Sequence, residues 1–326
     1  MEFTERDEII DENHPSLEYR RRRDDEKTCV SYGQRKLLLS LVSFLSQHCR
    51  SIDKVIILYV GAAPGNNISI AIDLFPGFEW HLYDPARFAL RTDVSKKVFV
   101  YQKYFEDDTA KYWSERKERN NENIIFISDI RTADYTKTKD LDENEDQIEL
   151  DMAMQRKWVE IIRPVVCQLK FRLSYSLEGR NNMFEYFDGL LYLQAFAPQT
   201  STECRLVFKE IKYKMYDCKK NEEQMFYHNA VVREKNRYEN EVADGIELVD
   251  DWDSSCEVHI WKMFLGENWT KEEVLKLSRE TTTLLNKDKK IPDTLSYLRA
   301  NPRIIKNRNF EKSKKKKKFK EKREEK

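Results

Sequence analysis

The sequence predicts an α/β fold built on a doubly wound, mostly parallel sheet. Its clearest element is residues 55–60, six apolar and mostly β-branched residues that continue through a glycine-containing turn into a helical pattern at residues 68–74. A strand buried on both faces shows this pattern when it leads into a crossover helix. Further apolar strands alternate with helical stretches as far as residue 169. This alternation is typical of parallel α/β sheets.

The first half of the chain supplies most of these elements. Residues 1–31 are polar and charged, and predict an N-terminal arm that is mobile or draped over the surface. Residues 34–48 place apolar side chains at helical spacing and predict a helix with one buried face. After the strand at 55–60, the pattern predicts strands at 79–83, 98–101 and 124–128, and a charged helix at 107–119.

The second half is predicted to complete one domain that spans residues 32–300. We expect a polar, acidic loop at 132–146, a long irregular connection at 181–202 and a lysine-rich disordered tail at 301–326. The remaining pattern predicts strands at 165–169, 203–208 and 257–264, and helices at 150–162, 222–235 and 270–285.

The distribution of charge bears on nucleic-acid binding. The 326 residues carry 58 basic and 58 acidic side chains, so any affinity for nucleic acid depends on uneven distribution. Basic residues gather at 20–23 and at 306–326, where twelve Lys and Arg face four Glu. These segments either bind RNA phosphates or are solvated surface.

The composition indicates neither a membrane segment nor a metal site. No apolar run reaches the roughly 18 residues that span a bilayer, and the first residues do not resemble a secretion signal. The six cysteines form no C-x-x-C pair, and the five histidines have no ligand-like spacing. We therefore expect a cytoplasmic protein with reduced thiols, no structural metal and no membrane contact.

The turn after residues 55–60 is a candidate cofactor loop. Gly61 and Gly65 allow a sharp turn and close approach of a ligand, but match neither the G-x-G-x-x-G pattern nor the phosphate-binding P-loop. The next strand ends at Asp84, whose carboxylate could bind both ribose hydroxyls of a nucleoside. A nucleoside cofactor without a diphosphate indicates S-adenosylmethionine. The alternative is an ordinary strand-turn-helix followed by a solvated aspartate.

Four charged residues stand at the ends of elements that should meet: Lys36, Asp129, Lys170 and Glu203. A lysine acts as a general base near neutral pH when desolvation or a second cation destabilises its ammonium and a carboxylate orients it. Lys36 and Arg205 could supply the cations. Such a K-D-K-E tetrad recurs in RNA ribose 2′-O-methyltransferases. Spacing alone also allows four ordinary surface charges.

Five segments of the chain match, in order, the motifs of one family. They are YGQRKLLL at residues 32–39, YVGAAPG at 59–65, ISDIR at 127–131, LKFR at 169–172, and LQAFAP at 193–198 followed by ECRL at 203–206. They resemble the poxvirus-type cap-specific mRNA (nucleoside-2′-O)-methyltransferases, which double as poly(A) polymerase regulatory subunits. The resemblance extends over roughly residues 17–240.

The resemblance implies a seven-stranded, Rossmann-like methyltransferase domain that uses S-adenosylmethionine. It implies methyl transfer to the 2′-hydroxyl of the first transcribed nucleotide of 7-methylguanosine-capped mRNA, with Lys170 as the base of the tetrad. Residues 84–87 read DPAR where the family has Asp-Gly-Arg, which moves the arginine by one position. The implied cofactor residues are Gln34, Tyr59, Gly61, Gly65, Asp84, Arg87, Phe105 and Asp129.

In this family the 7-methylguanine of the cap lies between two aromatic rings, and acidic groups bind its edge. Methylation makes the base cationic, which favours aromatic faces and carboxylates. Tyr175 and Tyr19 are the expected rings; Glu222 and, across a one-residue insertion, Glu178 are the expected acids. The full implied set for cap and RNA is Tyr19, Arg172, Tyr175, Glu178, Arg205 and Glu222.

The resemblance also implies partners and a location. The partners are capped mRNA and, as an option, a poly(A) polymerase catalytic subunit, in the cytoplasmic factory or the virion of a large DNA virus. Two alternatives remain: a catalytically idle RNA-binding or polymerase-stimulating subunit, and a methyltransferase of uncapped RNA. The intact tetrad and glycine loop favour an active enzyme, because a binding module needs neither.

Overall fold

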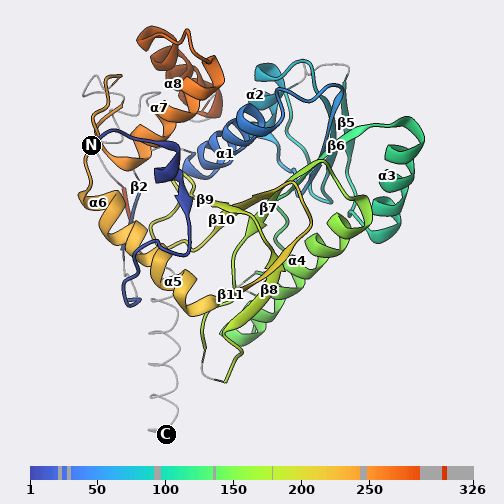
Figure 1. Cartoon of the computed structure of the whole chain (residues 1–326), viewed down its shortest axis with the longest axis horizontal. Helices are drawn as coiled ribbons and strands as arrows, with labels where there is room; N and C mark the ends of the chain where they lie inside the picture. Colours follow the sequence, from blue (N-terminus) through green and yellow to red (C-terminus); the bar gives the residue numbers. More distant parts are fainter. Residues whose placement is uncertain are drawn as a thin grey trace, which may run out of the picture.

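The computed structural model describes residues 1–20, 24–27, 31–91, 97–134, 137–177, 179–242, 248–286 and 303–306, with 24–27 and 303–306 described by their backbone alone. These residues fold around an eight-stranded sheet that helices cover on both faces (Figure 1). The strand order is β1-β9-β10-β7-β6-β3-β4-β5. The predicted α/β class with a doubly wound, mostly parallel sheet is confirmed.

Five parallel strands form the centre and one side of the sheet. They are β3 (Val55–Val60), β4 (Glu79–Tyr83), β5 (Val98–Tyr101), β6 (Asn123–Ser128) and β7 (Val166–Phe171). Beyond β7, β10 (Cys204–Phe208) runs antiparallel to both β7 and β9 (Leu190–Tyr192). The carboxyl ends of the five parallel strands and the amino end of β10 therefore lie at the same edge.

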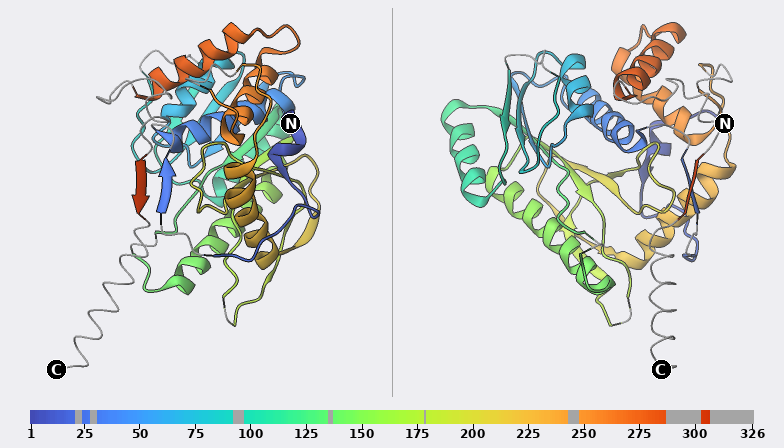
Figure 2. Two further views of the ribbon diagram at one scale, coloured as in Figure 1. Left: turned by 90° about the vertical axis from the view of Figure 1, so that its left-hand side faces the viewer. Right: turned by 180° about the vertical axis from the view of Figure 1, so that it is seen from behind.

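The helices form two layers, one on each face of the sheet (Figures 1 and 2). One layer contains α1 (Tyr32–His48), α2 (Asn66–Leu74), α7 (Trp252–Leu265) and α8 (Lys271–Asn286). The other contains α3 (Asp107–Asn120) and α4 (Leu141–Ile162), which pack on each other. Because the strands of the centre are covered on both sides, they are apolar throughout rather than alternating.

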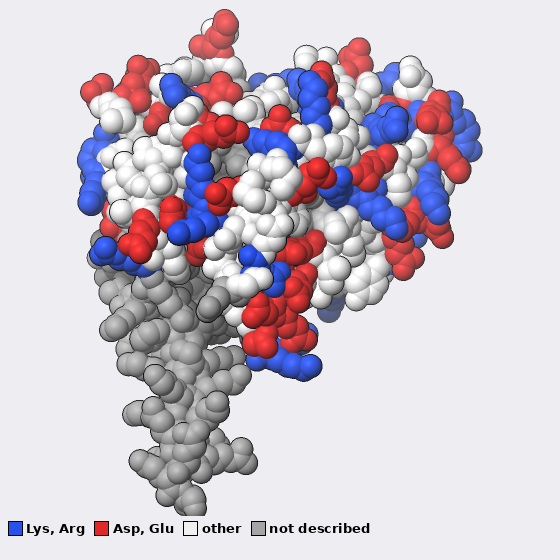
Figure 3. Space-filling model, turned by 60° about the horizontal axis from the view of Figure 1, so that its bottom comes forward, with Lys and Arg blue, Asp and Glu red and all other residues white. Residues whose placement is uncertain are grey.

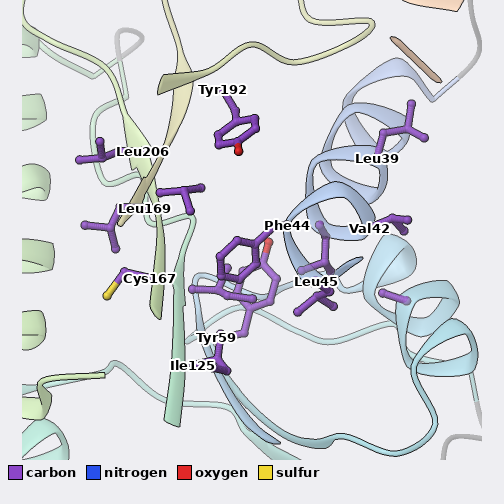
Figure 4. Close-up of a cluster of buried hydrophobic side chains, with 14 of the residues drawn as sticks. Leu39, Val42, Phe44, Leu45, Tyr59, Ile125, Cys167, Leu169, Tyr192 and Leu206 are labelled. Atoms are coloured by element: carbon purple, nitrogen blue, oxygen red, sulfur yellow. The ribbon is translucent and has the colours of Figure 1, made fainter. Parts of the chain in front are cut away.

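The hydrophobic core fixes α1 against the sheet. Leu38, Leu41 and Leu45 of this helix are at most 1% exposed, because their spacing puts them on its buried side. In Figure 4, Leu45 lies between α1 and the strands that carry Tyr59 and Leu169. Burial of a leucine side chain contributes roughly 1.5–3 kcal/mol. This packing holds the first turns of α1 in place at the edge of the sheet where the parallel strands end.

Shorter elements surround the main sheet. β8 (Met183–Phe187) pairs with β11 (Tyr213–Asp217), and β2 (Asp24–Lys27) pairs with β12 (Arg303–Lys306). The helix expected at 222–235 is present as α5 (Cys218–Tyr227), the π-helical turn η2 (His228–Val232) and α6 (Arg233–Lys235). Apart from β12, the tail expected to be disordered lies outside the described residues.

The N-terminal arm adds a strand to the sheet. The 3-10 turn η1 (Glu5–Glu8) leads into β1 (Ile9–Ile10), which pairs antiparallel with β9. Glu8 and Ile10 are buried. The expectation of an arm that is only mobile or draped over the surface is therefore wrong for residues 5–10. A two-residue strand is too short to produce a periodic apolar pattern.

Residues 257–264 are helical and not the strand that we predicted. They belong to α7, whose N-cap Asp251 accepts a hydrogen bond from a backbone N–H of the first turn at 2.8 Å. Gly266, at φ 82°, follows the last residue of the helix. Val258 and Ile260 follow the alternating apolar pattern of a strand because this helix is buried on several sides. The cap residues determine where the helix begins and ends.

Two expected loops contain regular structure. Residues 141–146 begin α4, because Asp140 caps the helix by accepting a hydrogen bond from the backbone N of Glu143 at 2.9 Å. The connection expected at 181–202 contains β8 and β9, which are separated by Asp188 and Gly189. A Cβ at that glycine would lie 2.5 Å from the backbone oxygen of Val207. Within the described residues, no helix is both long and apolar enough to cross a bilayer.

Candidate active site

The sheet topology brings the predicted charged residues together. Asp129 follows β6, Lys170 is the fifth residue of β7, and Glu203 immediately precedes β10. Lys36 lies in the first turns of α1, and Arg205 is the register partner of Lys170 across the β7–β10 pair. The parallel strands end at this edge and the antiparallel strand begins there, so residues far apart in the sequence meet at one point.

Three cations and two carboxylates form a connected network. Lys170 Nζ lies 3.0 Å from Asp129 Oδ1 and 3.5 Å from Glu203 Oε2. Lys36 Nζ lies 2.6 Å from Glu203 Oε1. Arg205 Nη2 lies 2.8 Å from Asp129 Oδ1 and 3.4 Å from Glu203 Oε1. Each of these side chains is 15% exposed or less, so the network is largely shielded from water.

Burial and the excess of positive charge set the ionisation of this network. Desolvation lowers the pKa of Lys36, although Glu203 opposes the shift. Burial alone would raise the pKa of Glu203, but the surrounding Lys170, Lys36 and Arg205 hold it well below its usual range. The pKa of Asp129 is also lowered, against the effect of burial, mainly by Arg205 and Lys170. Both carboxylates are therefore ionised at neutral pH, in a site with one cation in excess. This is the condition that favours release of a proton from a lysine.

The glycine loop lies directly beside the network. Gly61 has φ 80°, and a Cβ at this position would lie 2.7 Å from the backbone carbon of Asp129. The backbone N–H of Gly61 donates to the oxygen of Tyr83 at the end of β4, at 2.9 Å. Gly65 has φ 82° and precedes α2. Only glycine allows the loop to turn this closely over the neighbouring strand end.

Asp84 is held rigidly at the end of β4. Its Oδ2 accepts a hydrogen bond from the backbone N of Ala63 at 3.0 Å, and its Oδ1 accepts from the backbone N of Ala86 at 2.8 Å. Each carboxylate oxygen has a second lone pair. The carboxylate is half-buried, so it can still accept hydrogen bonds from two ribose hydroxyls.

An unsatisfied donor lies at the start of α2, close to the same loop. The backbone N of Asn67 donates to Gln34 Oε1 at 3.3 Å, which ties α1 to α2. The side-chain Nδ2 of Asn67 is buried and has no hydrogen-bond partner among the described residues. A buried donor of this kind fits a ligand acceptor. Together with Asp84 and the glycine loop, these groups fit a nucleoside-type cofactor such as S-adenosylmethionine.

The other expected cofactor residues differ in accessibility. Tyr59 is 4% exposed, and burial raises the pKa of its hydroxyl. Phe105 is 6% exposed and packs on Trp158, with ring centroids 5.1 Å apart, so its side chain belongs to the core. Arg87 is exposed on the loop after β4. Tyr59 and Phe105 are therefore buried, whereas Arg87 is accessible to solvent.

Tyr175, the first expected cap ring, is held by a buried acid. Glu145 of α4 is fully buried and accepts a hydrogen bond from the backbone N of Tyr175 at 2.8 Å. The same carboxylate pairs with Arg172, whose Nη2 lies 3.0 Å from Glu145 Oε1. The guanidinium carbon of Arg172 lies 4.0 Å from the centroid of the Tyr175 ring. A cation therefore already stacks on this ring in the free protein.

The remaining cap residues lie on α5 and on the arm. Burial raises the pKa of Glu222 on α5, while Arg172 partly opposes the shift. Phe226 lies one turn further along this helix and contacts Tyr19 edge to face, with centroids 5.4 Å apart. The backbone N of Leu17 donates to Glu223 at 3.2 Å, which fastens the arm to α5. Glu178 lies outside the described residues.

Comparison with known proteins places the chain in a family. A sequence model described as "Poly A polymerase regulatory subunit" matches residues 6–290. The chain belongs to the poly A polymerase regulatory subunit family. Its relatives include a cap-specific mRNA (nucleoside-2′-O-)-methyltransferase of fowlpox virus (strain NVSL), 28% identical over 217 residues, which are 62% of this chain and 68% of the relative. Another, of myxoma virus (strain Lausanne), is 30% identical over 252 residues, 70% of this chain and 69% of the relative.

This member of the poly A polymerase regulatory subunit family contains functional candidates that the sequence did not reveal. Glu145 stands within an acidic run that we expected to be a loop, so nothing distinguished it from solvated neighbours. Gln194 falls within a recognised motif but received no role there, although it contacts the charged network. Phe226 was one of many aromatic residues. In each case the signal is a contact across the fold rather than a local pattern.

Proposed function

We propose that the protein is a cap-specific mRNA 2′-O-ribose methyltransferase. It transfers a methyl group from S-adenosylmethionine to the 2′-hydroxyl of the first transcribed nucleotide of 7-methylguanosine-capped RNA. The observation that carries the proposal is the position of Lys170 Nζ between Asp129 and Glu203, beside the glycine loop. The names of the fowlpox and myxoma virus relatives support the same activity.

Lys170 acts as the general base. S-adenosylmethionine, when bound, supplies a methyl group on a positively charged sulfur. With this cofactor bound, the amine of Lys170 would take the proton of the 2′-hydroxyl, so that the ribose oxygen could accept the methyl group as the sulfur leaves. Asp129 and Glu203 orient the amine before transfer and stabilise the ammonium afterwards. Lys36 and Arg205 keep both carboxylates ionised through the reaction.

The cap binds next to this base in our proposal. The cationic 7-methylguanine stacks on Tyr175, where the guanidinium of Arg172 lies in the free protein. Glu222 binds the donor edge of the base, and Glu178 is expected to share that role. Tyr19, supported by Phe226, supplies the second ring. Arg172 and Arg205 lie beside the site with charge that suits RNA phosphates.

The face drawn in Figure 3 carries no single broad basic surface among the residues that the structure describes. Figure 3 shows basic and acidic side chains interspersed over the face that it presents, within the residues that the structure describes. Local contacts at the cap and at the tetrad are therefore expected to fix the substrate. We also propose, from the name of the family, that a poly(A) polymerase catalytic subunit is a partner. The setting would be the cytoplasm of a cell infected by a large DNA virus.

Transfer of a radiolabelled methyl group from S-adenosylmethionine tests the proposal. The substrates are RNA with a 7-methylated cap, RNA with an unmethylated cap and uncapped RNA. We expect transfer to the 7-methylated cap alone, at the 2′-oxygen of the first nucleotide. Equal transfer to uncapped RNA would favour the alternative substrate, and no transfer to any RNA would favour an idle binding subunit. The control is Lys157→Ala, which removes a lysine that is 61% exposed on α4.

A further inference from the structure

Gln194 is a buried polar residue that contacts the catalytic network without belonging to it. It follows β9 by two residues and is 4% exposed. Its side-chain amide lies against Glu203, just before β10, against Arg205 of β10 and against Ser40 of α1. A neutral polar side chain is costly to bury unless its hydrogen bonds are made, so its position depends on these three neighbours.

The charges of the neighbours fix the orientation of the amide. A carboxylate only accepts hydrogen bonds and a guanidinium only donates them. The amide nitrogen of Gln194 must therefore face Glu203 Oε1, at 3.1 Å, and its oxygen must face Arg205 Nε, at 2.9 Å. The same amide oxygen lies 3.0 Å from Ser40 Oγ. Gln194 thus holds an anion with one atom and a cation with another.

These contacts connect the two halves of the network. Ser40 stands one helical turn after Lys36, and its hydroxyl lies 2.9 Å from the carbonyl oxygen of that residue. Lys36 in turn pairs with Glu203 at 2.6 Å. Gln194 therefore lies between α1, which carries Lys36, and the start of β10, where Glu203 and Arg205 stand. Glu203 also contacts Lys170, and Arg205 contacts Asp129.

We propose that Gln194 is a positioning residue for methyl transfer, one that sets the field around Lys170 by fixing Glu203 and Arg205. This inference rests on the proposed function. It assigns no contact with substrate or cofactor to Gln194. An amide fits the position because it donates and accepts at once while adding no charge, which neither a glutamate nor a leucine of similar shape can do.

Loss of the amide changes the charge balance at Lys170 in one direction. Without the N–H donor of Gln194, the negative charge of Glu203 is stabilised mainly by its cationic partners, which include Lys36 and Lys170. Without the acceptor, Arg205 loses one of the contacts that hold it beside Asp129 and Glu203. Both changes favour the protonated lysine, so the enzyme requires a higher pH to generate the neutral base. Among the described residues, the other charged and titratable groups around this network include Asp129, Glu203, Lys36, Arg205, the hydroxyl of Tyr59 and the thiol of Cys204.

The test compares Gln194→Leu and Gln194→Glu with the wild type in kcat as a function of pH. We expect Gln194→Leu to lower kcat by about 10- to 100-fold, the usual effect of a small misplacement of catalytic groups. The acid limb of the profile should move to higher pH. Gln194→Glu adds a negative charge and should move the limb further. The affinity for S-adenosylmethionine, measured by calorimetry, should change less than twofold in both variants.

The matched control is Gln168→Leu. Gln168 is also a buried glutamine of the same region, 5% exposed, but its amide donates to the backbone oxygen of Ser40, at 3.0 Å, and within the described part of the chain it makes no hydrogen bond to the charged groups. It should lose stability comparably while keeping the pH profile of the wild type. Thermal unfolding and cofactor affinity establish that each variant is folded.

Two outcomes would overturn the inference: wild-type kcat in Gln194→Leu, or a lower kcat with an unmoved pH profile in both Gln194 variants. Lys170→Ala is measured in parallel to separate this failure from failure of the proposed function. If the wild type is inactive on capped RNA, or Lys170→Ala retains its activity, the proposed function fails. If the wild type is active and Lys170→Ala is not, an unaffected Gln194→Leu removes only the role of Gln194.

Discussion

Arg35 and Glu257 form a buried ion pair that connects α1 to α7. Arg35 Nε donates to Glu257 Oε2 at 3.0 Å, and Arg35 Nη2 donates to Glu257 Oε1 at 2.5 Å. The two side chains are 1% and 0% exposed. Thr282 of α8 accepts a further hydrogen bond from Arg35 at 2.8 Å. Because Arg35 stands between Gln34 and Lys36, this pair fixes the part of α1 that carries the proposed cofactor residue Gln34 and the proposed catalytic residue Lys36.

Removal of Arg35 alone should strongly destabilise the fold. Arg35→Leu leaves the Glu257 carboxylate buried without its cation, which typically costs about 3–5 kcal/mol. Arg35→Leu combined with Glu257→Leu should lose less than Arg35→Leu alone, because no isolated charge remains. The measurement is the free energy of unfolding in urea for the two single variants and the double variant. A double variant less stable than both single variants would contradict this explanation. Lys111→Ala, which removes an exposed ion pair, is the control and should change stability little.

Elements that depend on neighbouring residues were predicted well from the sequence, and some residues that are far apart in the sequence could also be brought together. The strand, turn and helix at 55–74 were predicted correctly, because their apolar pattern and glycines are local. Lys36 and Glu203 are 167 positions apart, yet both could be selected because each stands at the end of a predicted element. The strand expected at 257–264 was wrong because alternating apolar residues also occur in a helix buried on several sides.

Contacts between polar residues that occupy no recognisable local pattern could not be predicted. The pair of Arg35 and Glu257 joins an ordinary helical arginine to a residue assigned to a strand. Glu145 looked like one acid among many, and its role is visible only through Arg172 and Tyr175. A single sequence gives composition and periodicity, whereas the partners of a buried charge are set by the packing of distant elements.

Replacement of Lys170 should abolish methyl transfer without loss of cofactor binding. General-base catalysis contributes about 10²- to 10⁴-fold, so kcat of Lys170→Ala should fall by at least two orders of magnitude. Lys170→Arg should be almost as inactive, because a guanidinium remains protonated. Single-turnover transfer and calorimetry with S-adenosylmethionine separate the two effects. Substantial turnover by either variant would exclude Lys170 as the base.

Asp84→Asn should weaken the binding of S-adenosylmethionine. The amide keeps the size of the side chain but loses the charge that strengthens hydrogen bonds with ribose hydroxyls. Such bonds are worth about 1.5–3 kcal/mol, which corresponds to a Kd increased by about 10- to 100-fold. Calorimetric titration measures the change. Asp108→Asn is the control, since that carboxylate is 91% exposed on α3. Equal affinity in Asp84→Asn and the wild type would exclude the ribose contact.

Glu8 should make stability decrease as the pH rises. Burial raises the pKa of this carboxyl group from its usual 4.5 to about 8, and the nearby Glu5 and Asp7 add to the shift. His259 Nε2 lies 3.8 Å from Glu8 Oε1, and burial lowers the pKa of that imidazole, so it is a poor counter-ion. Between pH 4.5 and about 8 the unfolded chain has released a proton that the folded state retains. Within this window the folded state loses about 1.4 kcal/mol per pH unit, with little change below or above it.

The Glu8→Gln variant isolates this effect. Glutamine does not titrate, so the difference in unfolding free energy between wild type and variant should decrease with pH inside the window and be constant outside it. Urea unfolding at several pH values gives this difference. Glu2→Gln, at an exposed position of the arm, should show no such slope. A difference that does not vary with pH would mean that Glu8 is ionised in the folded protein.

Tyr175 should provide stacking energy that depends on methylation of the cap. Loss of one stack between a base and an aromatic ring costs about 1–3 kcal/mol, so Tyr175→Ala should weaken binding of a 7-methylated cap analogue by that amount. Tyr175→Phe should have little effect, because the ring remains. Glu222→Gln should also weaken binding, since a neutral amide loses the attraction to the cationic base.

The role of Tyr175 is tested most directly by comparing its affinity effect on 7-methylated and on unmethylated cap analogues. In the free protein the guanidinium of Arg172 lies 4.0 Å from the Tyr175 ring centroid, so the ring face already accepts a delocalised cation. A cationic base replaces that contact with an equivalent one, whereas an unmethylated guanine offers no charge in exchange. Preference for the methylated analogue should therefore fall in Tyr175→Ala and persist in Tyr104→Ala, where the ring is 68% exposed on the surface. If Tyr175→Ala kept the full preference, the base would be recognised elsewhere and methylation of uncapped RNA would become the better explanation of the site.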